Sequence, residues 1–217
     1  MNVIRCKVAL IGDPRVGKTS IVNQLVKNTF NGTYQTTLGV DYNQYEVKIK
    51  ETNYTVQFHI LDCSGFSPFR ELINKVISDV NFILYVYDTT NLDSFQSIKA
   101  WKETTKQMEI KSNVVEYLVG NKIEIPEKVV TDKVSVENLA KKYNFKSWQV
   151  SARGVQNLKE LFEEMANAYY ENYFKFIKIL KSKSEKKIVR DNKYIIDIYS
   201  SYGNIQRKKL FIIDFKN

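Results

Sequence analysis

Short apolar runs recur along most of the chain, and helix-like stretches separate them. The runs are rich in β-branched and aromatic residues and cover residues 8–11, 58–61, 82–87 and 117–119. Such runs predict strands buried on both faces of a parallel sheet. Helical spacing of apolar residues covers residues 19–27, 69–80, 94–108, 136–143 and 155 to about 181. Strands that alternate with helices predict a doubly wound α/β domain with its ligand at the carboxyl ends of the strands.

Two runs alternate between apolar and polar positions instead. They cover residues 45–49 and 54–58, with Glu51-Thr52-Asn53 between them. Alternation predicts strands with one exposed face, and the short polar connection predicts a hairpin. We therefore expect a mostly parallel sheet with one antiparallel edge strand.

The pattern changes after residue 181. Residues 182–187 are polar and charged, and apolar runs at 194–199 and 209–215 flank a segment that contains Gly203 and Asn204. These runs predict a β-hairpin. We therefore divide the chain into a domain at residues 1–181 and a basic C-terminal extension at residues 182–217. An isolated hairpin is marginal in water, so we expect it to dock on its own domain or on another protein.

The net charge of +9 is concentrated at the end of the chain. Residues 175–217 contain 12 Lys or Arg against 4 Asp or Glu, whereas the preceding residues are nearly balanced. Such a segment either faces an acidic protein, anionic lipid or nucleic acid, or is merely solvated. Nucleic acid is the least favoured partner, because the basic residues are spread among acidic ones and no known nucleic-acid-binding module is visible.

Composition indicates a soluble intracellular protein of the cytoplasm. No run approaches the ~18 consecutive apolar residues that cross a bilayer, and the first residues lack a signal-peptide pattern. The two cysteines, Cys6 and Cys63, are too few for a disulfide framework or a cysteine-based metal site. The single histidine, His59, lies in an alternating run and is expected to be a strand residue rather than a ligand or catalytic base.

Residues 12–19, Gly-Asp-Pro-Arg-Val-Gly-Lys-Thr, fit the pattern G-x-x-x-x-G-K-[ST] between a predicted strand and a predicted helix. This context is the one in which the pattern forms a phosphate-binding loop, so the fold is expected to be that of a P-loop NTPase. Backbone N–H groups, the Lys18 ammonium and the Thr19 hydroxyl would hold the phosphates and Mg²⁺. The expected nucleotide-binding residues here are Asp13, Pro14, Arg15, Val16, Gly17, Lys18, Thr19 and Ser20.

Four further segments follow this loop in an order that resembles the Ras superfamily, and the Rab branch in particular, over about residues 4–175. Residues 36–42 resemble the switch I segment T-I-G-V-D-F, and residues 61–65 resemble W-D-T-A-G. Residues 121–124 stand where N-K-x-D reads the base, and residues 151–153 where S-A-K closes over it. The order of the segments makes them jointly far more specific than any one alone.

The resemblance implies a small GTPase domain that binds GTP or GDP with Mg²⁺. The implied metal ligands are Thr19, Thr37 and, through water, Asp62, and the N–H of Gly65 would sense the γ-phosphate. The implied base-binding residues are Asn121, Lys122, Glu124, Ser151, Ala152 and Arg153.

Phe66 stands where most relatives carry the glutamine that orients the attacking water. An aromatic ring cannot replace that amide, so we expect no catalytic residue and a weak GTPase at best. Alternatively, Phe66 shields the site while a partner supplies a catalytic residue.

Three other positions in the nucleotide site depart from the family. Glu124 keeps the charge of the usual aspartate but adds a methylene, so the base must shift or bind less tightly. Pro14 lacks an N–H donor, and Arg15 either faces solvent or stabilises charge in cis.

Rab proteins end in prenylated cysteines, but no cysteine follows Cys63, and Asn2 stands where myristoylation needs glycine. We therefore expect neither lipid anchor, and only indirect contact with membranes. Two functions remain open: a regulatory switch read by a protein effector, and a permanently nucleotide-loaded structural subunit of a large assembly. The loop and residues 69–80 resemble Rab-like GTPases of intraflagellar-transport trains, which implies vesicular or ciliary transport and adds the cilium or flagellum as a location.

Overall fold

The computed structural model describes residues 2–108, 110, 113–183, 188–190, 193–199 and 208–214. The chain consists of two compact units, Met1–Asn167 and Ala168–Asn217. The first unit contains all of the predicted nucleotide-binding segments.

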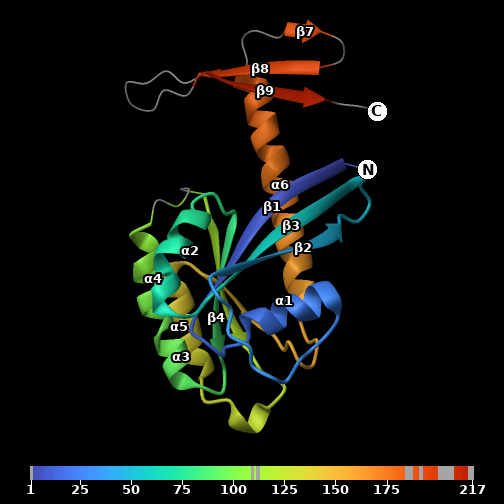
Figure 1. Cartoon of the computed structure of the whole chain (residues 1–217). Coiled ribbons are helices and arrows are strands. Elements are labelled where there is room, and N and C mark those ends of the chain that lie inside the picture. Colours follow the sequence, from blue (N-terminus) through green and yellow to red (C-terminus); the bar gives the residue numbers. More distant parts are fainter. Residues whose placement is uncertain are drawn as a thin grey trace. The chain divides into compact units, whose positions relative to one another are not determined.

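The first unit is built on a six-stranded sheet with the order β2-β3-β1-β4-β5-β6 (Figure 1). Its strands are β1 (Asn2–Ile11), β2 (Val40–Lys48), β3 (Tyr54–Cys63), β4 (Phe82–Asp88), β5 (Val115–Asn121) and β6 (Lys146–Gln149). Every neighbouring pair is parallel except β2 and β3, which form the antiparallel hairpin. The prediction of a mostly parallel sheet with one antiparallel edge strand is therefore confirmed.

Helices cover both faces of this sheet (Figure 1). The helices are α1 (Lys18–Lys27), α2 (Arg70–Val76), α3 (Leu92–Gln96), α4 (Ile98–Lys106), α5 (Lys133–Tyr143) and α6 (Leu158–Lys183), with short 3₁₀ helices η1 (Ser67–Phe69) and η2 (Pro126–Lys128). Helices α2 to α5 lie on one face, and α1 and the first turns of α6 on the other. This layering is why the central strands read as continuous apolar runs.

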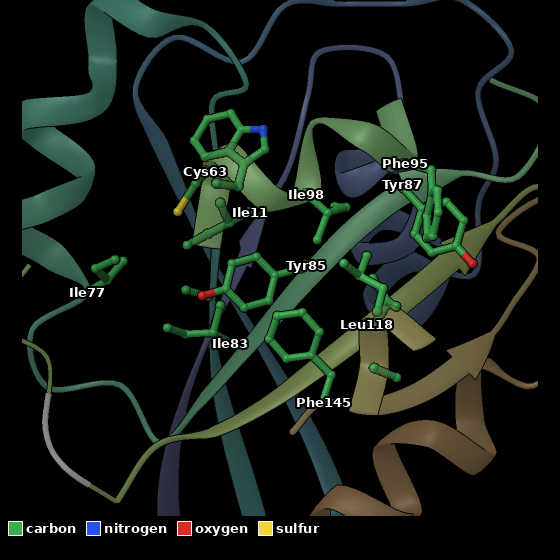
Figure 2. Close-up of a cluster of buried hydrophobic side chains, with 14 of the residues drawn as sticks. Ile11, Cys63, Ile77, Ile83, Tyr85, Tyr87, Phe95, Ile98, Leu118 and Phe145 are labelled. Carbon is green, nitrogen blue, oxygen red and sulfur yellow. The ribbon is translucent and has the colours of Figure 1, made fainter. Parts of the chain in front are cut away.

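The core on the α2–α5 face is aromatic and aliphatic (Figure 2). Tyr85 of β4 and Phe145, just before β6, have ring centroids 4.9 Å apart, beside Ile98 of α4. On the opposite face, Phe58 of β3 packs edge-on against Phe162 of α6 at 5.2 Å. Close packing on both faces holds the strands rigidly and so fixes where the loops at their carboxyl ends begin.

Element boundaries differ from the prediction where local hydrogen bonding decides them. The predicted helix at 94–108 is two helices, α3 and α4, and α3 begins earlier because Asn91 Oδ1 accepts from the N–H groups of Asp93 and Ser94. The predicted helix at 69–80 is shorter, ending at Val76. Strand β6 was not predicted, because its residues are largely exposed and carry no apolar pattern.

The second unit contains the end of α6 and a three-stranded antiparallel sheet. Strands β7 (Ile188–Arg190), β8 (Lys193–Tyr199) and β9 (Lys208–Asp214) pair in the order β7-β8-β9, with Tyr194 opposite Ile213. Strands β8 and β9 lie where the hairpin was predicted, whereas β7 was not predicted. Gly203 and Asn204 lie outside the described residues. None of the helices in the described ranges combines the length and the apolar character that crossing a bilayer requires.

Candidate functional site

A cavity of about 500 Å³ lies among the loops that follow β1, β3, β5 and β6. It brings together most of the residues predicted to bind nucleotide, although they come from segments more than 100 positions apart. The predicted residues that line it are Pro14, Arg15, Gly17, Lys18, Thr19, Ser20, Thr37, Gly65, Asn121, Lys122, Glu124, Ala152 and Arg153. The cavity therefore lies at the carboxyl ends of the strands, as the fold class predicts.

The loop between β1 and α1 closes around the Lys18 side chain. Its Nζ donates hydrogen bonds of 2.8 Å to the carbonyl oxygens of Gly12 and Asp13. Gly17, the N-cap of α1, has φ 95°, and a Cβ there would lie 2.3 Å from Nδ2 of Asn121. Glycine is thus required for both the left-handed conformation and the close approach.

Burial disfavours the charged forms of two side chains beside the phosphate-binding loop, Lys18 and Asp62. Burial lowers the pKa of Lys18 to about 8, and the nearby Asp62 carboxylate opposes this. Burial raises the pKa of Asp62 to about 6, opposed by the hydrogen bond from Thr19 and the charge of Lys18. An anion placed beside Lys18 and a cation beside Asp62 would each favour the charged form.

The three predicted metal ligands meet at this place. Thr19 Oγ1 donates to Asp62 Oδ2 at 2.6 Å and lies 3.1 Å from Thr37 Oγ1. The other carboxylate oxygen, Asp62 Oδ1, is buried and has no hydrogen-bond partner within the described part of the chain. Hydroxyl and carboxylate oxygens are hard ligands of the kind that Mg²⁺ prefers, so the residues fit this ion. Bound here, Mg²⁺ would neutralise the charge of neighbouring phosphate oxygens.

Asn121 ties three segments together at the other end of the cavity. Its Nδ2 donates to the carbonyl of Val16 at 3.0 Å, and its Oδ1 accepts from the N–H of Ala152 at 3.1 Å. The neighbouring Lys122 donates to the carbonyl of Arg15 at 2.9 Å and forms an ion pair of 2.5 Å with Asp88. The phosphate-binding loop and the base-binding segments thus form one hydrogen-bonded unit.

A hydrogen bond from Ser151 fixes the side chain of Glu124. Ser151 Oγ donates to Glu124 Oε2 at 2.5 Å and accepts from the N–H of Gly154 at 2.6 Å. Glu124 lines the cavity, but Ser151 is fully buried and does not. Ser151 therefore positions the Glu124 carboxylate and does not itself line the cavity.

The segment after β3 packs against the phosphate-binding loop and lines the cavity. A Cβ on Gly65 would lie 2.4 Å from the nitrogen of Pro14, so only glycine allows this approach. Phe66 follows, with 38% of its surface exposed, and lines the cavity. Its ring supplies no polar atom at the place predicted for the water-orienting amide.

Arg15 contacts another residue that lines the cavity, Tyr34. Its φ of 65° is in the left-handed region, and its guanidinium lies 5.0 Å from the centroid of the Tyr34 ring. Both residues line the cavity. The arginine is therefore stacked on an aromatic ring, a contact that sequence reasoning did not anticipate.

Some predicted residues lie behind the cavity, and some lining residues were missed. Asp13, Val16, Asp62 and Ser151 do not line it but contact residues that do. The lining residues that sequence reasoning missed are Asn23, Phe30, Asn31, Gly32, Thr33, Tyr34, Gln35 and Ser64. Two exposed aromatic residues, Phe30 and Tyr34, in an otherwise polar loop were the available signal.

A model of the Ras family matches residues 7–171, which is more than half of the chain. Proteins of this family in general bind GTP or GDP together with Mg²⁺.

Proposed function

This chain belongs to the Ras family of small GTP-binding proteins, and we propose on that premise that it is a Rab-like member that retains GTP and Mg²⁺ and hydrolyses GTP slowly or not at all. One observation carries the proposal: a single cavity is lined by Lys18, by Thr19 and Thr37, and by Glu124, and Asp62 lies directly behind it in hydrogen-bond contact with Thr19.

Each part of the cavity suits one part of the nucleotide. The N-terminus of α1 and the Lys18 ammonium attract phosphates. The acceptor oxygens of Glu124 suit the two N–H donors at the edge of guanine. Phe30, with 42% of its surface exposed, lines the cavity, and an aromatic ring there suits stacking on a base.

Slow hydrolysis follows from Phe66. A water molecule beside the terminal phosphate must be oriented by a hydrogen-bonding group. Phe66 lines the cavity, and its backbone N–H donates to Ser64 Oγ at 3.3 Å. A chain of this kind would keep GTP bound unless a partner supplied the missing group.

The experiment that tests this proposal identifies the nucleotide that the purified full-length chain contains. The protein is denatured, and the released nucleotide is separated by chromatography and quantified against protein. We expect close to one guanine nucleotide per chain, mostly GTP, and none from Lys18→Ala. Mostly GDP would contradict slow hydrolysis alone, whereas an empty wild-type chain would overturn nucleotide binding as a whole.

Single-turnover hydrolysis of GTP tests the role of Phe66 directly. Phe66→Gln restores an amide and should raise the rate by about tenfold or more, because positioned polar groups contribute at least that much. Phe66→Leu is the matched control, since it removes the ring without adding an amide. Equal rates of GTP hydrolysis in the two variants would show that the missing amide does not explain slow hydrolysis.

Two uses of this site remain, in vesicular or ciliary transport. As a switch, the chain would bind an effector at the apolar surface around Leu38, which is 77% exposed. The next residue, Gly39, lies close to Leu72 of α2, because a Cβ added to this glycine would be 2.9 Å from the leucine side chain. As a structural subunit, it would hold nucleotide permanently and dock through its C-terminal extension. Capture of partners by GTP- and GDP-loaded protein distinguishes them: a switch selects one nucleotide, whereas a subunit ignores it and loses its partner when residues 182–217 are removed.

A further inference from the structure

The indole of Trp101 links α4 to the phosphate-binding loop. Trp101 is only 4% exposed, and its Nε1–H donates a hydrogen bond of 2.7 Å to Oδ1 of Asp13, 88 positions earlier in the chain. A hydrogen bond to a charged acceptor at this distance is among the stronger ones in proteins. The side chain of Asp13 therefore points to α4, not into the cavity.

The same indole also contacts the first residue of α2. The guanidinium of Arg70 lies 5.2 Å from the centroid of the Trp101 ring, within the range of a cation–π contact. Arg70 is exposed at the surface while the ring beneath it is buried. One buried side chain thus joins a surface cation on α2 to an acid in the phosphate-binding loop.

Asp13 is the residue through which this link reaches the nucleotide site. Its carbonyl oxygen accepts from Lys18 Nζ at 2.8 Å. A Cβ on Gly65 would lie 2.5 Å from the carbonyl carbon of Asp13, so the segment leading into α2 rests on the same residue. Movement of Asp13 would therefore displace both the Lys18 ammonium and the packing of Gly65.

We propose that Trp101 and Arg70 are positioning residues that couple α2 to the phosphate-binding loop and thereby slow the release of bound nucleotide. The cation–π contact of Arg70 holds the indole in place, and the indole N–H in turn holds the side chain of Asp13. This proposal rests on the proposed function, since it concerns release of the nucleotide.

The test measures dissociation of a fluorescent GDP analogue from the full-length chain in excess unlabelled GDP. Trp101→Phe keeps an aromatic ring but loses the indole N–H, and we expect release about tenfold faster. Arg70→Ala should speed release about threefold, and Arg70→Lys should restore part of the difference. The double variant should be no faster than Trp101→Phe alone, because both changes break one link.

Two matched controls exist in the chain. Trp148→Phe removes a similar bond, in which Nε1–H donates to Glu164 Oε2 at 2.9 Å, and should leave release unchanged. Lys75→Ala removes an exposed cation from the same helix α2 and should also have no effect. In the Trp148→Phe background, Trp101 is the only tryptophan, so its emission should shift when Arg70→Ala is added.

Three outcomes are informative. Faster release with a non-additive double variant supports the coupling. Independent, multiplicative effects of the two changes, or effects matched by the controls, would overturn it while leaving nucleotide binding intact. A wild-type chain that retains no guanine nucleotide would overturn the proposed function and this inference together.

Discussion

The hydroxyl of Ser151 donates a hydrogen bond of 2.5 Å to Oε2 of Glu124, and the N–H of Gly154 donates to the same hydroxyl. The glutamate is one methylene longer than the aspartate it replaces, and a longer side chain loses more rotamer freedom when it binds. Ser151 reduces that loss by holding one oxygen in place. The second oxygen remains available to a base in the cavity.

Glu124→Gln should weaken binding of guanine nucleotides by about tenfold or more, since hydrogen bonds to a charged acceptor contribute about 1.5–3 kcal/mol. Ser151→Ala should weaken it less, because the carboxylate remains but is no longer held. Competition between GDP and ADP for the cavity provides the measurement. Glu127→Gln, an exposed change of the same kind in η2, is the control and should bind like wild type. If Glu124→Gln preferred GDP over ADP as strongly as wild type does, another group would have to recognise the base.

Asp62→Asn should raise the Mg²⁺ concentration that half-maximally slows nucleotide release by about tenfold. The change removes the only carboxylate of the oxygen cluster around Thr19, and hard cations depend on ligand charge. Removing Mg²⁺ with a chelator should speed release strongly in wild type and only weakly in the variant. Asp93→Asn, an exposed change of the same kind in α3, is the control and should depend on Mg²⁺ like wild type. An identical Mg²⁺ dependence in Asp62→Asn would place the ion elsewhere.

The sheet and the phosphate-binding loop could be predicted because each depends on local sequence. The apolar run before Gly12 forms β1, and Gly17 occupies the left-handed cap of α1 that the motif requires. The chain topology then brings Asn121 and Ala152 to that loop, because parallel strands end on the same side. The resemblance to the Ras superfamily predicted that these segments meet at the site, and the topology of the sheet explains why they do.

Contacts made between side chains of distant segments could not be predicted in this way. The bond from Trp101 to Asp13 and the stacking of Arg15 on Tyr34 depend on rotamers and on helix placement. No periodicity in the sequence encodes them. Strand β6 was missed for a related reason: an exposed edge strand has no apolar pattern, and its pairing with β5 alone defines it.

Arg15→Ala should release nucleotide about two- to fivefold faster than wild type, the range expected from an exposed cation–π contact. The guanidinium lies over the Tyr34 ring, and both residues line the cavity. Alanine keeps the backbone but removes this contact. Tyr34→Leu should have the same effect, whereas Tyr34→Phe keeps the ring and should not. Stopped-flow or manual dissociation of a fluorescent GDP analogue measures the rates. Faster release from Tyr34→Phe would implicate the hydroxyl instead of the stacking.

Stability should fall as pH rises from about 9 to 12. Burial raises the pKa of Cys63 and of Tyr87, each to about 12, and raises the pKa of Cys6, Tyr85 and Tyr117 as well. In the unfolded chain these groups lose protons near their ordinary values of about 8.5 for Cys and 10 for Tyr. The folded chain therefore binds more protons in this window, and its free energy of unfolding decreases with pH.

Lys18 acts in the opposite direction within the nucleotide-free chain. Its pKa is lowered to about 8, so the folded chain binds fewer protons than the unfolded one up to about pH 10.4. Near pH 9 the two cysteines already outweigh this single group, and the three tyrosines add to the effect at higher pH, so the net slope remains negative. Urea unfolding followed by circular dichroism at pH 8, 9.5 and 11 measures it. Tyr87→Phe removes one titrating group and should flatten the slope between pH 10 and 12; a wild-type stability that is constant or rises over this range would contradict the burial of these groups.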